Sequence, residues 1–303
     1  MHECRTPRNE TGEFDHTHGM KDATLTRAPP APTGRHQKIA RPAAVTTRVG
    51  VHWVAATLLV LLGFPAAAAA QADEIQVYDG GLAAKGTVNL TWHNNFIARG
   101  LTSPAFPGAV AANRSFNGVT EWALGVTNWF EAGLYLPLYS RDNRTGWGID
   151  GVKLRALFAV PNADDRRFFY GANFEFSYNA RRWDTTRFTS EVRPIVGWHL
   201  RPIDVIVNPI VDTAYDGLGK LELVPAVRIA YNFKPGWAVA AEEYDDYGSL
   251  SAFLPRPQQV HQFYGVVDRT WKSWDIQGGV GVGLTNGSDR LTFKLIVSRD
   301  LNR

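Results

Sequence analysis

Apolar and polar residues alternate along most of the chain after residue 73, in about twelve segments separated by turn residues. Alternation with a period of two predicts β-strands whose two faces differ in polarity. Most segments have about 11–14 residues, which exceeds the usual 5–6 of soluble strands and suffices for a tilted membrane strand of about 9–11. The expected strands are 86–97, 116–128, 130–140, 148–160, 168–179, 188–200, 203–215, 220–233, 236–246, 259–271, 274–284 and 289–300.

The connections between these segments alternate between short and long. Arg201–Pro202 and Lys234–Pro235 are short links, whereas 98–115, 180–187 and 247–258 are longer. Outer-membrane barrels have short periplasmic turns and longer external loops. The sequence therefore predicts an all-β fold, a closed antiparallel up-and-down transmembrane β-barrel of about 12 strands. Ten or fourteen strands are the alternatives if a segment has been merged or split.

Four prolines fall inside the expected strands, namely Pro137, Pro194, Pro209 and Pro225. A proline removes one hydrogen bond from a strand ladder and is usually confined to edges or bulges. Because a closed barrel has no free edge, we expect bulges or local bends at these positions.

The strand expected at 168–179 indicates which face meets lipid. Tyr170, Phe174 and Phe176 share one face, and Asn173 and Glu175 share the other. A twelve-stranded barrel is too wide for side chains to fill as a dry core, and aromatic residues gather at both strand ends, as at membrane interfaces. The apolar faces should therefore point to lipid and the polar faces into the lumen. A soluble periplasmic β-protein, with the faces reversed, is the alternative.

With apolar faces outward, ten charged residues are candidates for the lumen lining and for selectivity. Such charges either line a pore that selects solutes or pair with one another to brace the interior. We expect Glu175 and Arg193 to share one pairing network, and loops 98–115 and 247–258 to contribute to selectivity. The ten candidates are Glu121, Lys153, Arg155, Glu175, Glu191, Arg193, Asp212, Glu222, Arg228 and Lys294.

The first 72 residues have the pattern of an export signal. An apolar run at 49–64 follows Arg41 and Arg48 and precedes a small-residue site at 70–72. This order predicts a secretory signal peptide cleaved after Ala72, with an uncleaved anchor as the alternative. Residues 1–72 would be an N-terminal extension and signal peptide, and residues 73–303 a barrel in the outer membrane of a Gram-negative bacterium.

The leader also accounts for the basic charge of the whole chain. It holds 8 of the 32 basic and 5 of the 29 acidic residues, so 24 of each remain after residue 72. A formally neutral barrel gives no electrostatic support for binding nucleic acid. Cys4 is the only cysteine, which excludes a disulfide or thiolate metal site from the barrel.

Histidine usage bears on catalysis. The histidines after residue 72 are His93, His199 and His261, and no Gly-x-Ser-x-Gly motif occurs. We therefore expect no enzyme and no cofactor. The runner-up is an outer-membrane lipid-modifying hydrolase with His93 or His261 as the base. A third option is a non-conducting structural barrel that acts as a scaffold or adhesin.

Two further stretches contain residue types that occur in binding sites. Glu243, Asp245 and Asp246 indicate a solvated rim rather than a metal site, because no histidine or further carboxylate is next to them in the sequence. The glycine-rich stretch 278–283 lies within an expected strand and precedes no helix, so it is not a phosphate loop. It should instead permit tight curvature or leave room for an inward loop.

Several stretches together resemble a family. They include 73–78 (DEIQVY), 120–125 (TEWALG), 193–198 (RPIVGW) and 238–244. They resemble proteobacterial outer-membrane β-barrel transporters near the group named for a MetA pathway of phenol degradation. The resemblance spans nearly all of 73–303. The recurring polar positions of that pattern are matched by Glu121, Arg155, Glu175, Arg193 and Glu242.

The resemblance implies passive passage or binding of a small solute, aromatic or hydrophobic compounds included. The implied partners are outer-membrane lipid, the barrel assembly machinery and a small-molecule solute. Barrels of this kind usually end on an aromatic residue that the assembly machinery recognises. This chain ends on Leu301, Asn302 and Arg303, so either Leu301 substitutes or the end is unusual.

Overall fold

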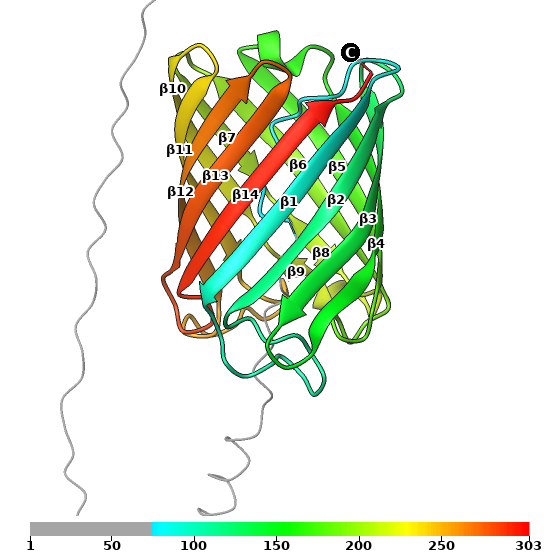
Figure 1. Cartoon of the computed structure of the whole chain (residues 1–303), viewed down its shortest axis with the longest axis vertical. Coiled ribbons are helices and arrows are strands. Elements are labelled where there is room, and N and C mark those ends of the chain that lie inside the picture. Colours follow the sequence, from blue (N-terminus) through cyan, green and yellow to red (C-terminus); the bar gives the residue numbers. More distant parts are fainter. Residues whose placement is uncertain (1–73, 303) are drawn as a thin grey trace, which may run out of the picture. The chain divides into compact units, whose positions relative to one another are not determined.

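The first strand of the sheet is hydrogen-bonded to the last, so the sheet closes on itself (Figure 1). The structure is a computed structural model that describes residues 74–302; the predicted signal peptide lies outside these residues. Every pair of neighbouring strands in the sheet is antiparallel. The strands are β1 (Val88–Arg99), β2 (Ser115–Gly125), β3 (Phe130–Asp142), β4 (Gly146–Ala159), β5 (Phe168–Asn179), β6 (Phe188–His199), β7 (Ile203–Asn208), β8 (Val211–Thr213), β9 (Glu222–Leu223), β10 (Ala226–Lys234), β11 (Trp237–Asp246), β12 (Val260–Trp271), β13 (Trp274–Gly283) and β14 (Leu291–Asp300).

These fourteen elements make twelve strands around the barrel. β7 and β8 are two halves of one strand, and β9 and β10 are two halves of another, because each pair is separated by two residues that include a proline. The predicted closed antiparallel barrel of twelve strands is confirmed. The expected strand at 168–179 has the observed bounds of β5, and the bounds of most other strands differ by one to three residues.

The alternation of the sequence places apolar side chains on the outside of the barrel wall. On β5, Phe176 is 52% exposed, whereas its neighbour Glu175 is 1% exposed and faces the lumen. Leu154 on β4 and Leu295 on β14 are likewise exposed, and the adjacent Arg155 and Lys294 are buried. The predicted orientation, with apolar side chains outward and charges inward, is confirmed.

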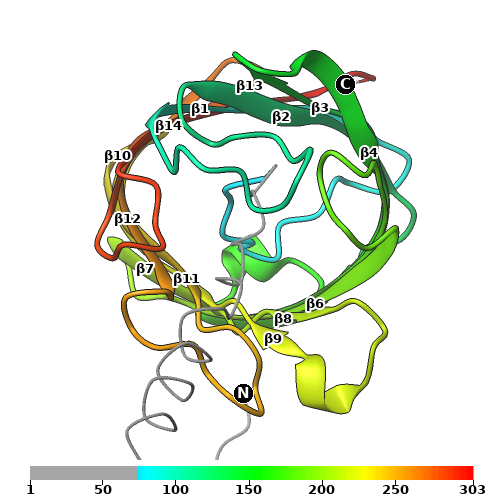
Figure 2. The same cartoon turned by 90° about the horizontal axis from the view of Figure 1, so that it is seen from below.

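The two ends of the barrel differ in their connections (Figure 1). Links 126–129, 200–202 and 272–273 lie at one end, the short-turn end. Links 100–114, 180–187 and 247–259 lie at the other, the long-loop end, which Figure 2 shows face on. Within residues 74–302 the helices are the three-residue 3₁₀ turns η1 (Ala163–Asp165) and η2 (Leu218–Lys220), and none is long and apolar enough to cross a bilayer.

The prolines interrupt the ladder at three of the four predicted positions. Pairing of β3 with β4 skips Pro137, and Pro209 and Pro225 each separate two half-strands. Pro194 differs, because β6 is continuous and stays paired with β5 there. On its other side, β6 pairs with β7 from Val196 onward and with β8 up to Val192. Pro194, which has no N–H group, therefore lies opposite the gap between β7 and β8 at Pro209. Because β6 makes no ladder hydrogen bond across this gap, the proline removes none.

Two glycines make room for aromatic rings inside the barrel. Gly197 is paired with Phe169, and Gly281 is paired with Tyr264. A Cβ atom at either glycine would overlap the partner ring. Gly281 of the glycine-rich stretch thus admits the inward ring of Tyr264, which in turn packs with Ile75.

Candidate functional site

The lumen contains the chain's own N-terminal segment, defined here as residues 74–85. The segment crosses the interior of the ring (Figure 2) and leads to the start of β1 at the short-turn end (Figure 1). Ile75, Val77 and Tyr78 are at most 6% exposed. Sequence reasoning missed this placement, because the segment has no periodicity and its partners in the lumen lie far away in the sequence.

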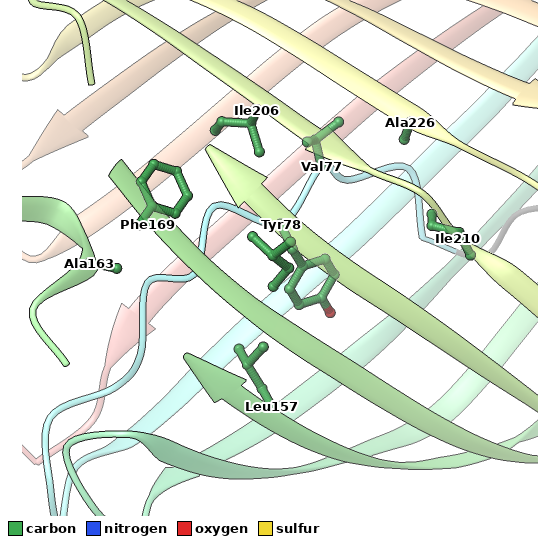
Figure 3. Packing of buried hydrophobic residues seen from close by; sticks show 9 residues of the cluster. Val77, Tyr78, Leu157, Ala163, Phe169, Ile206, Ile210 and Ala226 are labelled. Atoms are coloured by element: carbon green, nitrogen blue, oxygen red, sulfur yellow. The ribbon is translucent and has the colours of Figure 1, made fainter. Parts of the chain in front are cut away.

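The segment lies on an apolar patch of the lumen wall. Val77 and Tyr78 pack against this patch (Figure 3). Burying apolar side chains is worth about 25 cal/mol per Å² of surface, so the contact favours docking of the segment. The apolar patch consists of Leu157, Phe169, Ile195, Ile206, Ile210 and Ala226.

Asn208 fixes the main chain of the segment at Tyr78. Its Oδ1 accepts a hydrogen bond from Tyr78 N at 2.7 Å, and its Nδ2 donates to Tyr78 O at 3.0 Å. Asn208 is fully buried at the end of β7, where the strand is interrupted before Pro209. Its side-chain amide therefore hydrogen-bonds both main-chain groups of Tyr78, as the main chain of a neighbouring strand would.

A first ion cluster surrounds Arg155 and includes the Tyr78 hydroxyl. Arg155 Nη2 lies 2.7 Å from Glu121 Oε1 and also pairs with Glu131. Its Nη1 donates to Tyr78 OH at 3.3 Å. The hydroxyls of Tyr78 and Tyr135 lie 2.5 Å apart. The cluster thus binds the only polar atom of the Tyr78 side chain.

A second ion cluster surrounds Arg193 and binds the segment at two points. Arg193 Nε lies 2.6 Å from Glu191 Oε1, and Nη1 donates to the carbonyl of Gln76 at 2.9 Å. Nη1 is also 3.8 Å from Glu74 Oε1. Glu74 lies before the first strand, and its burial, with the nearby charge of Glu175, raises its pKa to about 7 despite Arg193.

A third ion cluster surrounds Lys294 on the opposite wall. Lys294 Nζ pairs with Glu242 and donates to the carbonyl of Ile75 at 3.0 Å. Arg228 pairs with both Glu242 and Asp268. One cation from each of the three clusters therefore binds the N-terminal segment, at Tyr78, Gln76 and Ile75 respectively.

Carboxylates form a row across neighbouring strands on the lumen wall. The pairing register places Glu175 opposite Glu191, Glu191 opposite Asp212, and Asp212 opposite Glu222. Lys153 Nζ is 3.4 Å from Glu175 Oε2, and Arg193 pairs with Glu191. Two cations thus accompany four acids, so this part of the wall has an excess of negative charge. We refer to these four residues as the acidic row.

The structure places all ten predicted lumen residues in the three ion clusters or in the acidic row with its two cations; nine are buried or half-buried, and Glu222 is exposed at the long-loop end. Glu175 and Arg193 belong to neighbouring parts of one charged region but have different closest partners, Lys153 and Glu191. The prediction missed Glu74, Glu131 and Tyr135. Glu131 was missed because the face of 130–140 was not assigned from its mixed pattern.

The three histidines all face carboxylates. His93 is fully buried, with Nε2 3.2 Å from Glu121 Oε2. His199 Nδ1 is 2.7 Å from Asp204 Oδ1, and His261 Nδ1 is 2.7 Å from Asp245 Oδ1. Within residues 74–302, no serine or threonine hydroxyl is hydrogen-bonded to a histidine ring. The arrangement of a nucleophile beside its base is therefore not formed there.

Solved structures with a similar fold are outer-membrane β-barrels, among them channels. The COG4313 outer membrane channel from Pseudomonas putida F1 matches with a TM-score of 0.51 at 12% sequence identity, over 75% of this chain and 100% of that one. This chain has the fold of an outer-membrane β-barrel.

Two porins are similar at lower scores. The KdgM porin, solved in complex with disordered oligogalacturonate, has a TM-score of 0.46 at 10% identity, over 71% of this chain and 99% of the porin. The NanC porin has a TM-score of 0.47 at 9% identity, over 71% and 100%. No family model and no curated sequence matches this chain.

Proposed function

We propose that this protein is an outer-membrane channel for a small solute, closed by its own N-terminal segment and opened when that segment is displaced. The observation that supports it is the triple attachment of the segment to Arg155, Arg193 and Lys294. These attachments are individual hydrogen bonds, each with a net worth of about 0.5–3 kcal/mol. Such bonds hold a segment in place and still permit its release, which suits a gate rather than a permanent core.

The site that the segment occupies indicates the class of solute. Release of Tyr78 would expose the apolar patch beside the Tyr135 hydroxyl and the guanidinium of Arg155. An apolar wall with a few convergent polar groups is typical of small-molecule sites. We propose that the solute is a small ring compound with one polar group, in agreement with the resemblance to the MetA group.

The hydrolase is less well supported. His93 is enclosed by Glu121 inside the lumen and has no access to membrane lipid, while His261 is on the outer wall with Asp245 and Gln259 at its ring nitrogens. Within residues 74–302, neither imidazole ring is hydrogen-bonded to a serine or threonine hydroxyl; Ser288 Oγ bonds only the main chain of His261. The orienting carboxylate is present in both pairs, but the group that would attack an ester is missing from the described residues.

Current blockade in a planar bilayer tests the solute class. In a barrel from which residues 74–85 are deleted, we expect benzoate to block the single-channel current in the millimolar range and a sugar of similar size to leave it unchanged. Leu157→Asn with Ile206→Asn should weaken the benzoate block several-fold, because both side chains form the apolar patch. Equal block by the sugar would contradict this solute class.

A further inference from the structure

A carboxylate–histidine–carboxylate group lies on the outer wall at the long-loop end. Glu243 and Asp245 belong to β11, and His261 belongs to β12. Inward side chains on β11 are Glu242 and Tyr244, so the odd-numbered side chains face outward. The strand register pairs Asp245 directly with His261. One ligand atom from each of Glu243, Asp245 and His261 lies within 4.8 Å of the others.

The sequence alone favours a solvated rim over a metal site, because no histidine is next to Glu243, Asp245 and Asp246. The fold supplies that histidine. His261 follows Asp245 by sixteen positions, and the sequence shows no histidine next to the acidic residues. The β11–β12 register brings His261 opposite Asp245, and their closest atoms are 2.7 Å apart. A histidine therefore completes the pair of carboxylates.

The hydrogen bonds of Gln259 determine how the His261 ring is protonated. Gln259 Nε2 donates to the carbonyl of Leu254 at 2.7 Å, which fixes the orientation of the amide. Gln259 Oε1 therefore faces His261 Nε2 at 3.0 Å and must accept its proton. A metal-binding histidine usually donates the N–H of one ring nitrogen to a neighbouring acceptor, and this hydrogen bond orients the other ring nitrogen toward the metal.

The remaining ring nitrogen faces a second acceptor. His261 Nδ1 is 2.7 Å from Asp245 Oδ1, a hydrogen-bond distance, so a proton lies between them. Tyr247 OH donates to Asp245 Oδ2 at 3.2 Å and orients the carboxylate. Glu243 is exposed and has no ion-pair partner among residues 74–302. A second cation ligand is thus available beside the His261–Asp245 pair.

We propose that Glu243, Asp245 and His261 bind one divalent metal ion of the zinc class. Imidazole suits zinc and its neighbours, and carboxylate oxygen bonds zinc at about 2.0–2.2 Å. Ligands at such distances around a tetrahedral ion lie roughly 3.3 Å apart, so the ion would fit among the three groups once His261 Nδ1 and Asp245 Oδ1 move apart from 2.7 Å. The metal replaces the proton on Nδ1, and solvent water completes its coordination. A metal ion bound by these residues links β11 to β12 at the base of loop 247–259, which connects the two strands.

Zinc titration of the purified protein in detergent tests this proposal. We expect one Zn²⁺ per chain with a dissociation constant in the micromolar range, and Co²⁺ in its place should give a visible absorption of tetrahedral character. His261→Gln should weaken Zn²⁺ binding at least tenfold, and Glu243→Gln with Asp245→Asn should do the same. These outward substitutions leave the lumen networks in place, so heat-modified gel mobility should still show a folded barrel.

The matched control is His199→Gln. His199 also pairs with an aspartate at 2.7 Å but has no second carboxylate in a metal group of the described residues. The His199→Gln substitution should therefore leave Zn²⁺ binding unchanged. Equal Zn²⁺ affinity in the parent and the His261→Gln protein would overturn the proposal. Tighter binding of Ca²⁺ than of Zn²⁺ would also overturn it, because that preference indicates a carboxylate rim without an imidazole ligand.

Discussion

Lys294 on β14 donates a hydrogen bond through its Nζ to the carbonyl oxygen of Ile75, 3.0 Å away and 219 positions earlier in the chain. This bond joins the last strand to the N-terminal segment. The same ammonium pairs with Glu242, which also pairs with Arg228. When the segment leaves, Lys294 and Arg228 still pair with Glu242. Release of the segment therefore leaves no unpaired charge in this cluster, which is a property that a gate needs.

Loss of this bond should favour opening. In Lys294→Met, Glu242 keeps Arg228 as its partner, and the segment loses one charged hydrogen bond worth about 1.5–3 kcal/mol. We expect the open fraction in single-channel recordings to rise about tenfold or more. Lys153→Met serves as the control, since it also removes a lumen cation but one that pairs with Glu175. Equal opening in both variants would show that lumen charge, rather than the Ile75 bond, controls the gate.

Opening should depend on pH through Glu74. Burial raises its pKa from 4.5 to about 7 in the docked segment, so the docked state holds the proton more tightly than the released state. Docking is then most favourable below about pH 4.5 and weakens as the pH rises to about 7. We expect the open fraction to increase between pH 5 and 7 and to level off above. Glu74→Gln should remove this increase and keep the channel as closed at pH 7 as the parent is at pH 5.

The acidic row should make the open channel select cations. In a barrel without residues 74–85, the reversal potential in a KCl gradient should show preference for K⁺ over Cl⁻, because rings of carboxylates favour cations in a pore. Glu191→Gln with Asp212→Asn should lower the preference several-fold. Glu243→Gln removes an acid from the outer wall and should not change it. A preference for Cl⁻ would contradict this account of the lumen.

Gly281 should be essential for packing inside the barrel. A methyl group in Gly281→Ala would overlap the ring of Tyr264, and overpacking of this kind costs about 1–3 kcal/mol. The variant should unfold at lower temperature in a heat-modified gel mobility assay. Gly278→Ala is the matched control, because a Cβ atom there meets nothing within 4 Å. Equal unfolding temperatures in the two variants would refute the close contact.

The sequence was sufficient for the strands and their two faces, because strand periodicity is a local property. The β5 bounds follow from its alternation alone, and the exposure of Phe176 beside buried Glu175 was predicted. The split at Pro209 also follows from local chemistry, since proline cannot donate to a ladder.

The contents of the lumen could not be predicted in this way. Ile75 meets Lys294, and Tyr78 meets Asn208, across separations of 219 and 130 positions. The one local signal was that Ile75, Val77 and Tyr78 are apolar although they lie outside the expected strands. The pairing of Asp245 with His261 was likewise hidden, because it depends on the register across loop 247–259.

The central claim is that the N-terminal segment closes the lumen, and planar-bilayer conductance tests it most directly. The full protein and a variant lacking residues 74–85 should be refolded, checked for heat-modified gel mobility, and recorded in the same salt. The account predicts a small or intermittent conductance for the full protein and a stable, several-fold larger conductance for the variant. A folded variant whose conductance equals that of the full protein would contradict it.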